Sequence, residues 1–258
     1  MSTLTTHTTG TRATPSGSNI GLCKFNTTNK AIEVSDGTNW LVYLKDGIAS
    51  GYFPSNSYSG QFDGSGDYIS VPTISELNAP SAFSTSCWFR PQGTVSNYAI
   101  LSGGSSSSNR FYIQLQTATN IRYGNGSAFD DFTISSVSDT AWYHLATVQN
   151  GSTLEVFLNG TSVGTATVNA PQSGYGTYFT IGGYRVAGAS TAFFNGYLDE
   201  LSIFDTALTT TEIDNIRTKK VYPDRVALWR LENDATDNEG NYNGTNNGVT
   251  FVTSTKPY

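Results

Sequence analysis

The sequence is poor in charged residues, in cysteine and in long apolar runs. Lys, Arg, Asp and Glu together make up 13% of its 258 residues, and the formal net charge is −6. No run of Lys or Arg is present that could neutralise a row of phosphates, so we expect no nucleic-acid partner. One of the longest apolar stretches, Trp40 to Leu44, is far shorter than the roughly 20 residues that cross a bilayer, so we expect no membrane partner.

Cysteine is nearly absent: the two that occur, Cys23 and Cys87, fall in segments that are assigned below to different modules. The N-terminus also lacks the charged start and the apolar centre of a signal peptide. Both features favour free thiols in a chain that folds in a reducing cytosol, rather than a disulfide.

Strand and tight-turn residues are abundant instead. Gly, Ser, Thr and Asn are frequent, and aromatic residues reach 13%. Residues 142–148 and 154–158 alternate with a period of two, and the turn pairs Asn150-Gly151 and Asn159-Gly160 follow them. Two Asn-Gly turns so close together predict an antiparallel meander.

One short helix is expected among these strands. Thr209 and Glu212 have the spacing of a capping box, and Ile213 and Ile216 would share one helical face. The predicted fold class is therefore all-β with a single short helix.

Composition divides the chain into four segments. Residues 1–18 are rich in Thr, Ser and Gly and have almost nothing to bury, so they are expected to form a flexible arm. Residues 19–46 contain three short strand patterns and are predicted to be a small β-meander. Residues 47–59 have the composition of a linker, and residues 60–258 are predicted to hold the main β-sandwich.

The segment that includes the meander resembles a small module of bacteriophage structural proteins, particularly fibres and surface proteins. The matching residues are Arg12, Pro15, Phe25 to Asn29, Ile32 to Val34, Gly37 and Trp40. A meander this small cannot bury enough apolar area alone, so it must pack on the sandwich, on a sister chain or on a virion lattice. The expected attachment residues are Ile20, Leu22, Phe25, Ile32, Val34, Trp40 and Val42.

Four stretches of the long segment resemble the laminin-G-like and pentraxin-like group of the concanavalin A-like superfamily. They are Phe62 to Ile69, Trp142 to Val148 with Val156 to Gly160, Gly196 to Ile213, and Trp229 to Thr245. The resemblance implies an antiparallel jelly roll of two sheets.

The order of these stretches departs from the family pattern. In the usual order, a strand like that of Trp229 comes first and leads into a segment like that of Phe62. Here it comes last, which implies a circularly permuted domain that the C-terminal strands complete. Those strands could close their own sandwich or that of a neighbouring copy. We favour their own, because the connection from Phe204 to Leu228 can reach that sheet without ordering a second chain.

No catalytic residue is predicted. Sugar-cleaving members of this superfamily carry two carboxylates on one strand face, in a Glu-x-Asp-x-Glu pattern or a close relative of it. No such triplet occurs here. Asp130-Asp131 and Asp199-Glu200 are adjacent pairs, and adjacent residues of a strand point to opposite faces.

Asp199 allows two interpretations. It shares strand parity with Leu201 and Ile203, so its carboxylate is expected to point into the core. A buried carboxylate needs hydrogen-bond donors or a metal ion. Either it accepts backbone N–H groups of a tight turn, or it binds Ca²⁺ together with turn carbonyls and Asp237 or Asn241, whose loop is rich in oxygen ligands. Some members of the family bind Ca²⁺ near such positions, so Ca²⁺ is the one cofactor considered.

Several aromatic residues lie in or beside expected loops. Tyr98, Tyr123 and Tyr184 are candidates for contact with a glycan, because rings can stack on the faces of sugars. The alternative is that so many aromatics pack inside the fold and line contacts between subunits.

We expect a non-enzymatic protein, and the resemblance implies a bacteriophage virion protein, either a capsid decoration protein or a fibre component. Its N-terminal part would attach to the major capsid or tail protein, and its sandwich would face outward. We expect assembly in the host cytoplasm, location in the virion and a homo-oligomeric state. The alternatives are a carbohydrate-binding module for host surface glycans and, less favoured, a glycan-degrading enzyme.

Overall fold

A computed structural model describes residues 57–186, 189–219 and 222–253, together with the backbone of five short strands nearer the N-terminus. The chain divides into two compact units, each of which is described by itself. One comprises residues 1–55 with 214–224, and the other residues 56–213 with 225–258. No helix among the described residues is long and apolar enough to span a bilayer.

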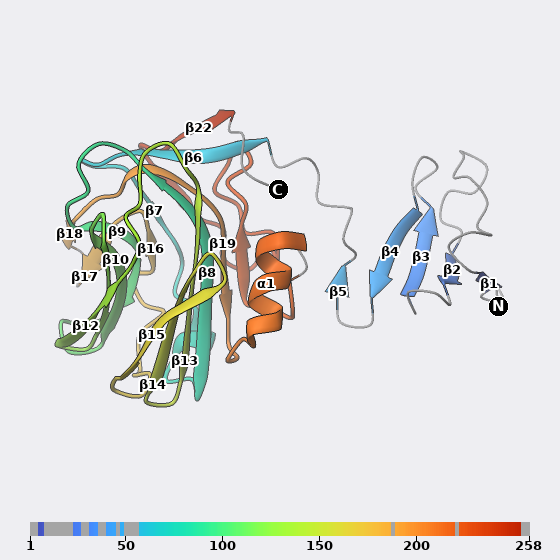
Figure 1. Cartoon of the computed structure of the whole chain (residues 1–258), viewed down its shortest axis with the longest axis horizontal. Helices are drawn as coiled ribbons and strands as arrows, with labels where there is room; N and C mark the ends of the chain where they lie inside the picture. The colour runs from blue at the N-terminus through green and yellow to red at the C-terminus, as the bar shows by residue number, and fades with distance from the viewer. Residues whose placement is uncertain are drawn as a thin grey trace. The chain divides into compact units, whose positions relative to one another are not determined.

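The N-terminal strands form one five-stranded sheet in chain order (Figure 1). They are β1 (Thr5–His7), β2 (Cys23–Asn26), β3 (Ala31–Ser35), β4 (Trp40–Leu44) and β5 (Gly47–Ile48). The antiparallel pairs β2–β3 and β3–β4 are the predicted meander. Strand β1, which pairs in parallel with β2, lies in the segment predicted to be an arm, and β5 lies in the segment predicted to be a linker. Neither has an apolar pattern that would have revealed it.

The second unit is a sandwich of two antiparallel sheets, which confirms the predicted fold class. The first sheet has seven strands in the order β12 (Ala128–Thr133), β11 (Asn120–Asn125), β10 (Arg110–Thr117), β9 (Tyr98–Gly104), β16 (Thr180–Ile181), β7 (Tyr68–Ser70) and β21 (Thr245–Asn247). The second has eight: β15 (Thr161–Thr167), β14 (Thr153–Leu158), β13 (Tyr143–Asn150), β8 (Ala82–Pro91), β19 (Asn195–Phe204), β6 (Tyr58–Asp63), β22 (Thr250–Thr253) and, pairing with β19, β20 (Ala227–Trp229).

Three smaller elements complete the described part of this chain. They are a 3-10 helix (Ser75–Leu77), a hairpin of β17 (Tyr184–Val186) and β18 (Ala189–Thr191), and helix α1 (Thr210–Lys219). The capping box is confirmed: Thr209 N donates to Glu212 Oε2 at 2.8 Å, and Glu212 N donates back to Thr209 Oγ1 at 3.3 Å.

The Asn-Gly meander forms as predicted. Strand β13 pairs with β14, and β14 pairs with β15. Gly151, Asn159 and Gly160 have positive φ angles of 56°, 52° and 80°, which tight hairpin turns require. The turn chemistry therefore sets this part of the eight-stranded sheet.

The C-terminal strands complete the sandwich of their own chain. Strand β20 pairs with β19, β21 with β7, and β22 with β6. Figure 1 shows β22, in red, beside β6, in cyan. Trp229 is 0% exposed and stacks on Phe179 with ring centroids 5.7 Å apart, while Leu231 is 1% exposed. The expectation that these residues seal the core is confirmed.

Part of the outer face of the eight-stranded sheet is covered by the segment that follows β19. Ser84, on β8, donates its hydroxyl to Thr206 O at 2.7 Å and accepts Leu208 N at 3.0 Å. Cys87, on the opposite face of β8, is a free and buried thiol. Burial raises the pKa of Cys87 to about 12, so this thiol is inert.

Candidate functional site

The outer face of the seven-stranded sheet holds the main group of chemically informative side chains. Along β10, Phe111, Ile113 and Leu115 face the core, so Tyr112 between them lies on the other face of the sheet, where it is 7% exposed. Tyr112 pairs with Gly124 on β11, and Gly124 pairs with Phe129 on the edge strand β12. A Cβ atom at Gly124 would overlap the Tyr112 ring, so the glycine makes room for that ring against the sheet.

An arginine and a carboxylate lie beside this row. Arg122 pairs across the strands with Asp131, and its Nε and Nη2 donate to the two carboxylate oxygens of Asp131 at 2.8 Å each. The Arg122 guanidinium also lies 3.7 Å from the centroid of the Phe129 ring. The hydrogen bond to Asp131 raises the pKa of Arg122, and the same bond lowers the pKa of Asp131. Phe129 is 51% exposed, more than any other large hydrophobic side chain among the described residues.

A second arginine lies at the start of β10. The Nε of Arg110 donates to Gly126 O at 2.9 Å, and its Nη1 donates to the hydroxyl of Tyr184. The Tyr112 and Tyr184 rings meet edge to face with centroids 5.0 Å apart. Arg110, Tyr112, Arg122, Phe129, Asp131 and Tyr184 are called the arginine–aromatic cluster below.

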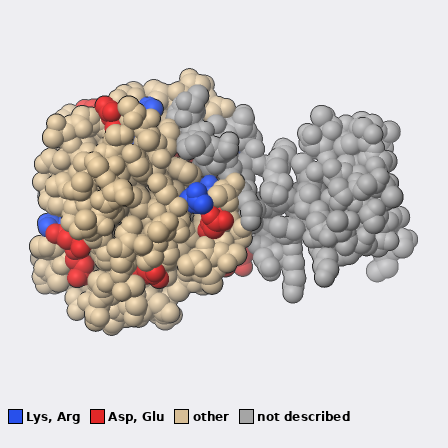
Figure 2. Space-filling view, viewed as in Figure 1, with Lys and Arg blue, Asp and Glu red and all other residues tan. Residues whose placement is uncertain are grey.

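The charges of this cluster act on Tyr112. Burial raises the pKa of Tyr112; Arg110 and Arg122 oppose the rise, and Asp131 adds to it. The phenol therefore stays protonated at neutral pH and remains able to donate a hydrogen bond. Charged side chains are sparse on the face of the sandwich drawn in Figure 2, where they form small separate groups among uncharged surface.

A pocket of about 320 Å³ lies among the loops at one end of the same sheet. It is lined by Thr73, Ile74, Ser75, Asn78, Gly174, Gly176 and Thr177. These residues present hydroxyl, amide and backbone groups rather than a charged or nucleophilic constellation. Close to this pocket, the Tyr242 hydroxyl donates to the carboxylate of Glu76 and lies 3.1 Å from Ser75 Oγ.

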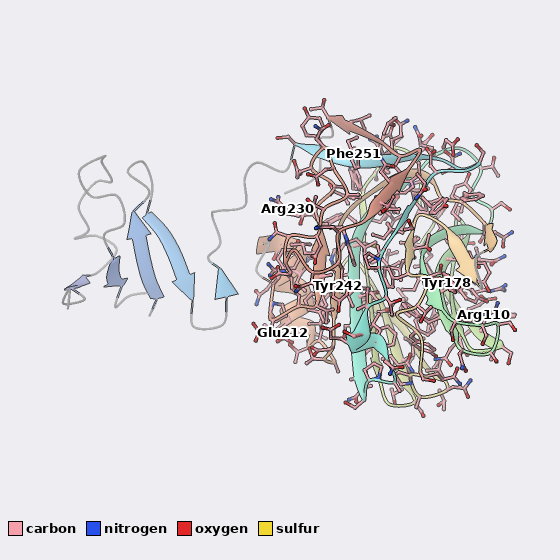
Figure 3. All side chains as sticks on the ribbon, turned by 180° about the vertical axis from the view of Figure 1, so that it is seen from behind. Arg110, Tyr178, Glu212, Arg230, Tyr242 and Phe251 are labelled. Carbon is pink, nitrogen blue, oxygen red and sulfur yellow. The ribbon has the colours of Figure 1, made fainter. Side chains whose placement is uncertain are left out.

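The pocket and the cluster approach each other at the junction of β9 and β10. Thr177 O, in the pocket wall, accepts the N–H of Gly104 at 2.7 Å, and Gly104 pairs with Arg110. Figure 3 labels Arg110 and the 42% exposed Tyr178 on the same side of the sandwich, away from Arg230 and Glu212. The pocket wall and the start of β10 are therefore connected through the backbone of Gly104.

Of the three tyrosines predicted to contact a glycan, one belongs to the cluster. Tyr184 is half-buried beside Tyr112. Tyr123 is 0% exposed and donates its hydroxyl to Gln149 Oε1 at 2.7 Å, so its ring is part of the core. Tyr98 is 9% exposed and donates to Thr94 O at 2.9 Å, so it fastens a loop.

Sequence reasoning did not select the two arginines, Tyr112 or Phe129 as a group. Period-two alternation from Arg110 to Gln116 is visible in the sequence and places Tyr112 opposite the core-facing residues. The register that sets Tyr112 beside Gly124 and Phe129 is a tertiary property with no local signal.

The residues predicted to bind Ca²⁺ are only partly brought together. Asp237 accepts four backbone N–H groups: those of Leu228 and Glu239 at Oδ1, and those of Asn241 and Tyr242 at Oδ2. Asp237 and Asn241 thus share a turn. No group of three or more His, Cys, Asp or Glu residues in the described ranges is arranged to hold a metal ion. The calcium site stays a prediction.

The strand parity expected for Asp199 is altered by a bulge in β19. Asp199 pairs with Trp88 and Ser202 pairs with Ser86, so three steps on β19 match two on β8. Asp199 therefore lies on the face opposite the one inferred from Leu201. Its Oδ1 accepts the N–H of Glu200 at 2.7 Å. The bulge explains why counting residues along the strand gave the wrong face.

Glu200 is buried as well. It has a φ of 47° at the bulge and is 1% exposed. Its Oε1 accepts Nε of Arg230 at 3.1 Å, within an ion pair in which both side chains are almost fully buried. The adjacent acids Asp199 and Glu200 thus both serve the packing of β19.

The predicted attachment residues belong to the N-terminal unit. Ile20 and Leu22 lie outside the described residues. Phe25, Ile32, Val34, Trp40 and Val42 lie on strands β2, β3 and β4, where the structure describes the backbone alone.

Comparison with known proteins supports the fold. The sequence profile of the concanavalin A-like lectin/glucanases superfamily matches residues 63–214, more than half of the chain. No curated protein matches the chain significantly.

Similar solved structures include a Bacteroides ovatus protein that has been assigned to carbohydrate binding, with 17% identity and a TM-score of 0.62 over 88% of this chain and 68% of that one. A heptameric SAP-like pentraxin from Limulus polyphemus has 18% identity and a TM-score of 0.60, over 78% of this chain and 97% of that one. The CBM40 of the Ruminococcus gnavus IT-sialidase has 13% identity and a TM-score of 0.50, over 64% of this chain and 100% of that one. At these identities the likeness shows the fold.

Proposed function

The chain belongs to the concanavalin A-like lectin/glucanases superfamily, and from this premise we propose that its sandwich is a non-catalytic carbohydrate-binding domain that acts through the arginine–aromatic cluster. The observation that carries the proposal is the 51% exposed Phe129 ring, which lies on the same sheet face as Tyr112 and the half-buried Tyr184 that adjoins it. Rings on a rigid sheet can pack on the C–H faces of sugars, while nearby guanidinium and phenol groups can bond to hydroxyls. The Bacteroides ovatus and Ruminococcus gnavus neighbours add support.

The chemistry of the acidic residues supports binding rather than cleavage. A glycosidase needs one carboxyl that donates a proton and a second roughly 5–10 Å away. Asp131 is the carboxylate of the cluster, and its bidentate bond to Arg122 lowers its pKa, which suits a structural anion and not a proton donor. Asp199 and Glu200 are buried in the bulge of β19.

A glycan array with the full chain tests this function. The Phe129→Ala variant is expected to lose at least tenfold in affinity for the glycans that the parent binds, because it removes the exposed ring. Phe129→Tyr keeps a ring and is expected to retain binding. Thermal unfolding monitors the fold of both variants. Equal binding by the parent and the alanine variant, or no binding by the parent to any glycan, would rule the proposal out.

We also propose that residues 1–46 attach this domain to a bacteriophage particle, through the major capsid protein or a tail protein. The support is the resemblance of residues 12–40 to phage surface modules, and the presence of a separate sheet, β1 to β5, in its own compact unit. On this proposal the protein is assembled in the host cytoplasm as a homo-oligomer. The segments are an arm (1–18) that contains β1, a meander (19–46), a linker (47–59) that contains β5 and the start of β6, and the sandwich (60–258).

Deletion of residues 1–45 tests attachment. The shortened chain is expected to be absent from purified particles and to retain the circular dichroism and cooperative unfolding of the sandwich. Electron micrographs of particles with and without the protein would then show whether it lies on the capsid or the tail. Normal incorporation of the shortened chain would refute the role of these residues.

A further inference from the structure

The two arginines of the cluster differ in their charge environment. Arg122 is neutralised by the carboxylate of Asp131, with two bonds of 2.8 Å. Arg110 has no carboxylate partner among the described residues, although acidic residues outnumber basic ones by 20 to 14 in the chain. One face of the sheet therefore carries a compensated cation and an uncompensated one.

Arg110 is held in a fixed orientation. Its Nε is bound by Gly126 O and its Nη1 by the Tyr184 hydroxyl. Its guanidinium carbon lies 5.5 Å from the centroid of the Tyr112 ring and 5.4 Å from that of Tyr184. This half-buried side chain is already ordered in the free protein. Binding of an anion would therefore cost little further side-chain conformational entropy.

The hydrogen bonds of Arg110 leave donors available. A guanidinium has five N–H groups, and the two bonds above use one on Nε and one on Nη1. The second N–H of Nη1 and the two of Nη2 make no hydrogen bond to the described residues, and N–H groups on neighbouring guanidinium nitrogens can bind a carboxylate or a sulfate in bidentate fashion. The phenol of Tyr112, kept protonated, adjoins the same guanidinium.

From this geometry we propose that Arg110 receives the anionic group of an acidic sugar, and that the exposed Phe129 ring packs against the sugar ring. The ligand class of the site is thus glycans that carry a carboxylate or a sulfate. This inference rests on the proposed carbohydrate-binding function and narrows it to one kind of sugar. Arg122 supports the Phe129 ring and takes no part in anion recognition, because its positive charge is already neutralised by the carboxylate of Asp131.

The test uses pairs of probes that differ in charge. They are trigalacturonic acid and its fully methyl-esterified form, sialyllactose and lactose, and galactose 6-sulfate and galactose. Calorimetry with the full chain is expected to show at least a tenfold preference for the charged member of one or more pairs, which equals about 1.4 kcal/mol. The uronate, sialate and sulfate arms distinguish a carboxylate from a sulfate ligand.

Three variants assign the preference to one residue. Arg110→Gln should abolish it, leaving the charged and neutral members within about twofold of each other. The double variant Arg122→Gln/Asp131→Asn removes a charge-neutral pair from the same sheet face. It should weaken binding of both members of each pair, because Arg122 packs on Phe129, and should keep the ratio between them. Arg90→Gln removes a cation from β8 on the other sheet, where the guanidinium lies over Tyr197 at 4.2 Å, and should also keep it. Thermal unfolding confirms that each variant is folded.

The outcomes separate the two proposals. Binding of neutral sugars with no preference for charge, or a preference that survives in Arg110→Gln, overturns the role of Arg110 and leaves carbohydrate binding in place. If Arg90→Gln loses the preference to the same extent as Arg110→Gln, the preference comes from the overall charge of the protein. That result would also overturn the role of Arg110. No binding to any probe, together with no binding on the glycan array, overturns both.

Discussion

Gly124 shows how a missing side chain can shape a surface. The Tyr112 ring of the neighbouring strand lies where a Cβ atom at Gly124 would be, so the aromatic row depends on this glycine as much as on its rings.

The Gly124→Ala variant is therefore expected to displace the Tyr112 ring. We expect about 1–3 kcal/mol less stability, as for other overpacked sites, and at least a tenfold loss of glycan affinity. Urea unfolding and calorimetry measure the two effects. Gly66→Ala is the matched control, because a Cβ there meets no atom within 4 Å. Full glycan affinity in Gly124→Ala would contradict the placement of the site.

A second residue-level prediction concerns Asp237, a buried carboxylate that accepts four backbone N–H groups. In Asp237→Asn an NH₂ group replaces one acceptor oxygen, so two of those N–H groups lose their partner. The cost is expected to be about 2–4 kcal/mol, measured by urea unfolding. Exposed Asp139→Asn should change stability by less than about 0.5 kcal/mol.

The same variants test the predicted calcium site of Asp199, Asp237 and Asn241. A rise in the parent's unfolding midpoint on addition of Ca²⁺, absent in Asp237→Asn, would support that site. An equal rise of the unfolding midpoint in both proteins would mean that Ca²⁺ binds at a site that does not include Asp237.

At the scale of single elements, local signals predicted those structures whose cause is local. The Asn150-Gly151 and Asn159-Gly160 turns formed because few other residue pairs tolerate such backbone angles. The helix began where Thr209 and Glu212 could bond to each other's backbone. The bulge in β19, in contrast, is set by pairing with β8, so the sequence pattern around Asp199 did not reveal it.

The same distinction applies to the candidate site. Alternation along β10 identifies an outward face, but Phe129 and Asp131 join that face only through the register of β11 with β12. Tyr123 failed to reach the surface because its strand turns it toward Gln149 in the core. Position near a loop is thus a poor guide to exposure when the loop belongs to a tightly paired hairpin.

The capping box provides the prediction for an element. Thr209→Ala removes the acceptor of the Glu212 N–H and the hydroxyl that bonds to its carboxylate. The expected loss is about 1 kcal/mol, with faster amide exchange in the first turn of α1. Thr211→Ala, at an exposed position inside the helix, should be neutral or slightly stabilising because Ala has the higher helix propensity. Equal effects of the two substitutions would mean that the cap contributes nothing.

At the scale of the whole molecule, the last strands are structural necessities. Strands β20, β21 and β22 each pair with a strand from an earlier part of the chain, and they carry Trp229 into the core. Removing them would open both sheets and leave a large cavity beside Phe179.

Deleting residues 225–258 is therefore expected to abolish cooperative unfolding of the sandwich. Loss of Trp229 alone would cost about 3–5 kcal/mol, which is a large part of the stability of an ordinary domain. Calorimetry and near-ultraviolet circular dichroism measure the loss. A synthetic peptide of residues 225–253, added in trans, should restore the spectrum. A shortened chain that still melts cooperatively would show that the core is sealed without these strands.

The register of β6 with β22 sets Tyr58 opposite Thr253, so the sandwich starts and finishes on adjoining strands about 5 Å apart. Because its first and last strands are neighbours, a domain with this geometry can be inserted into a single surface loop of a host protein without stretching that loop. Insertion at this point would leave the outer face of the seven-stranded sheet unaltered.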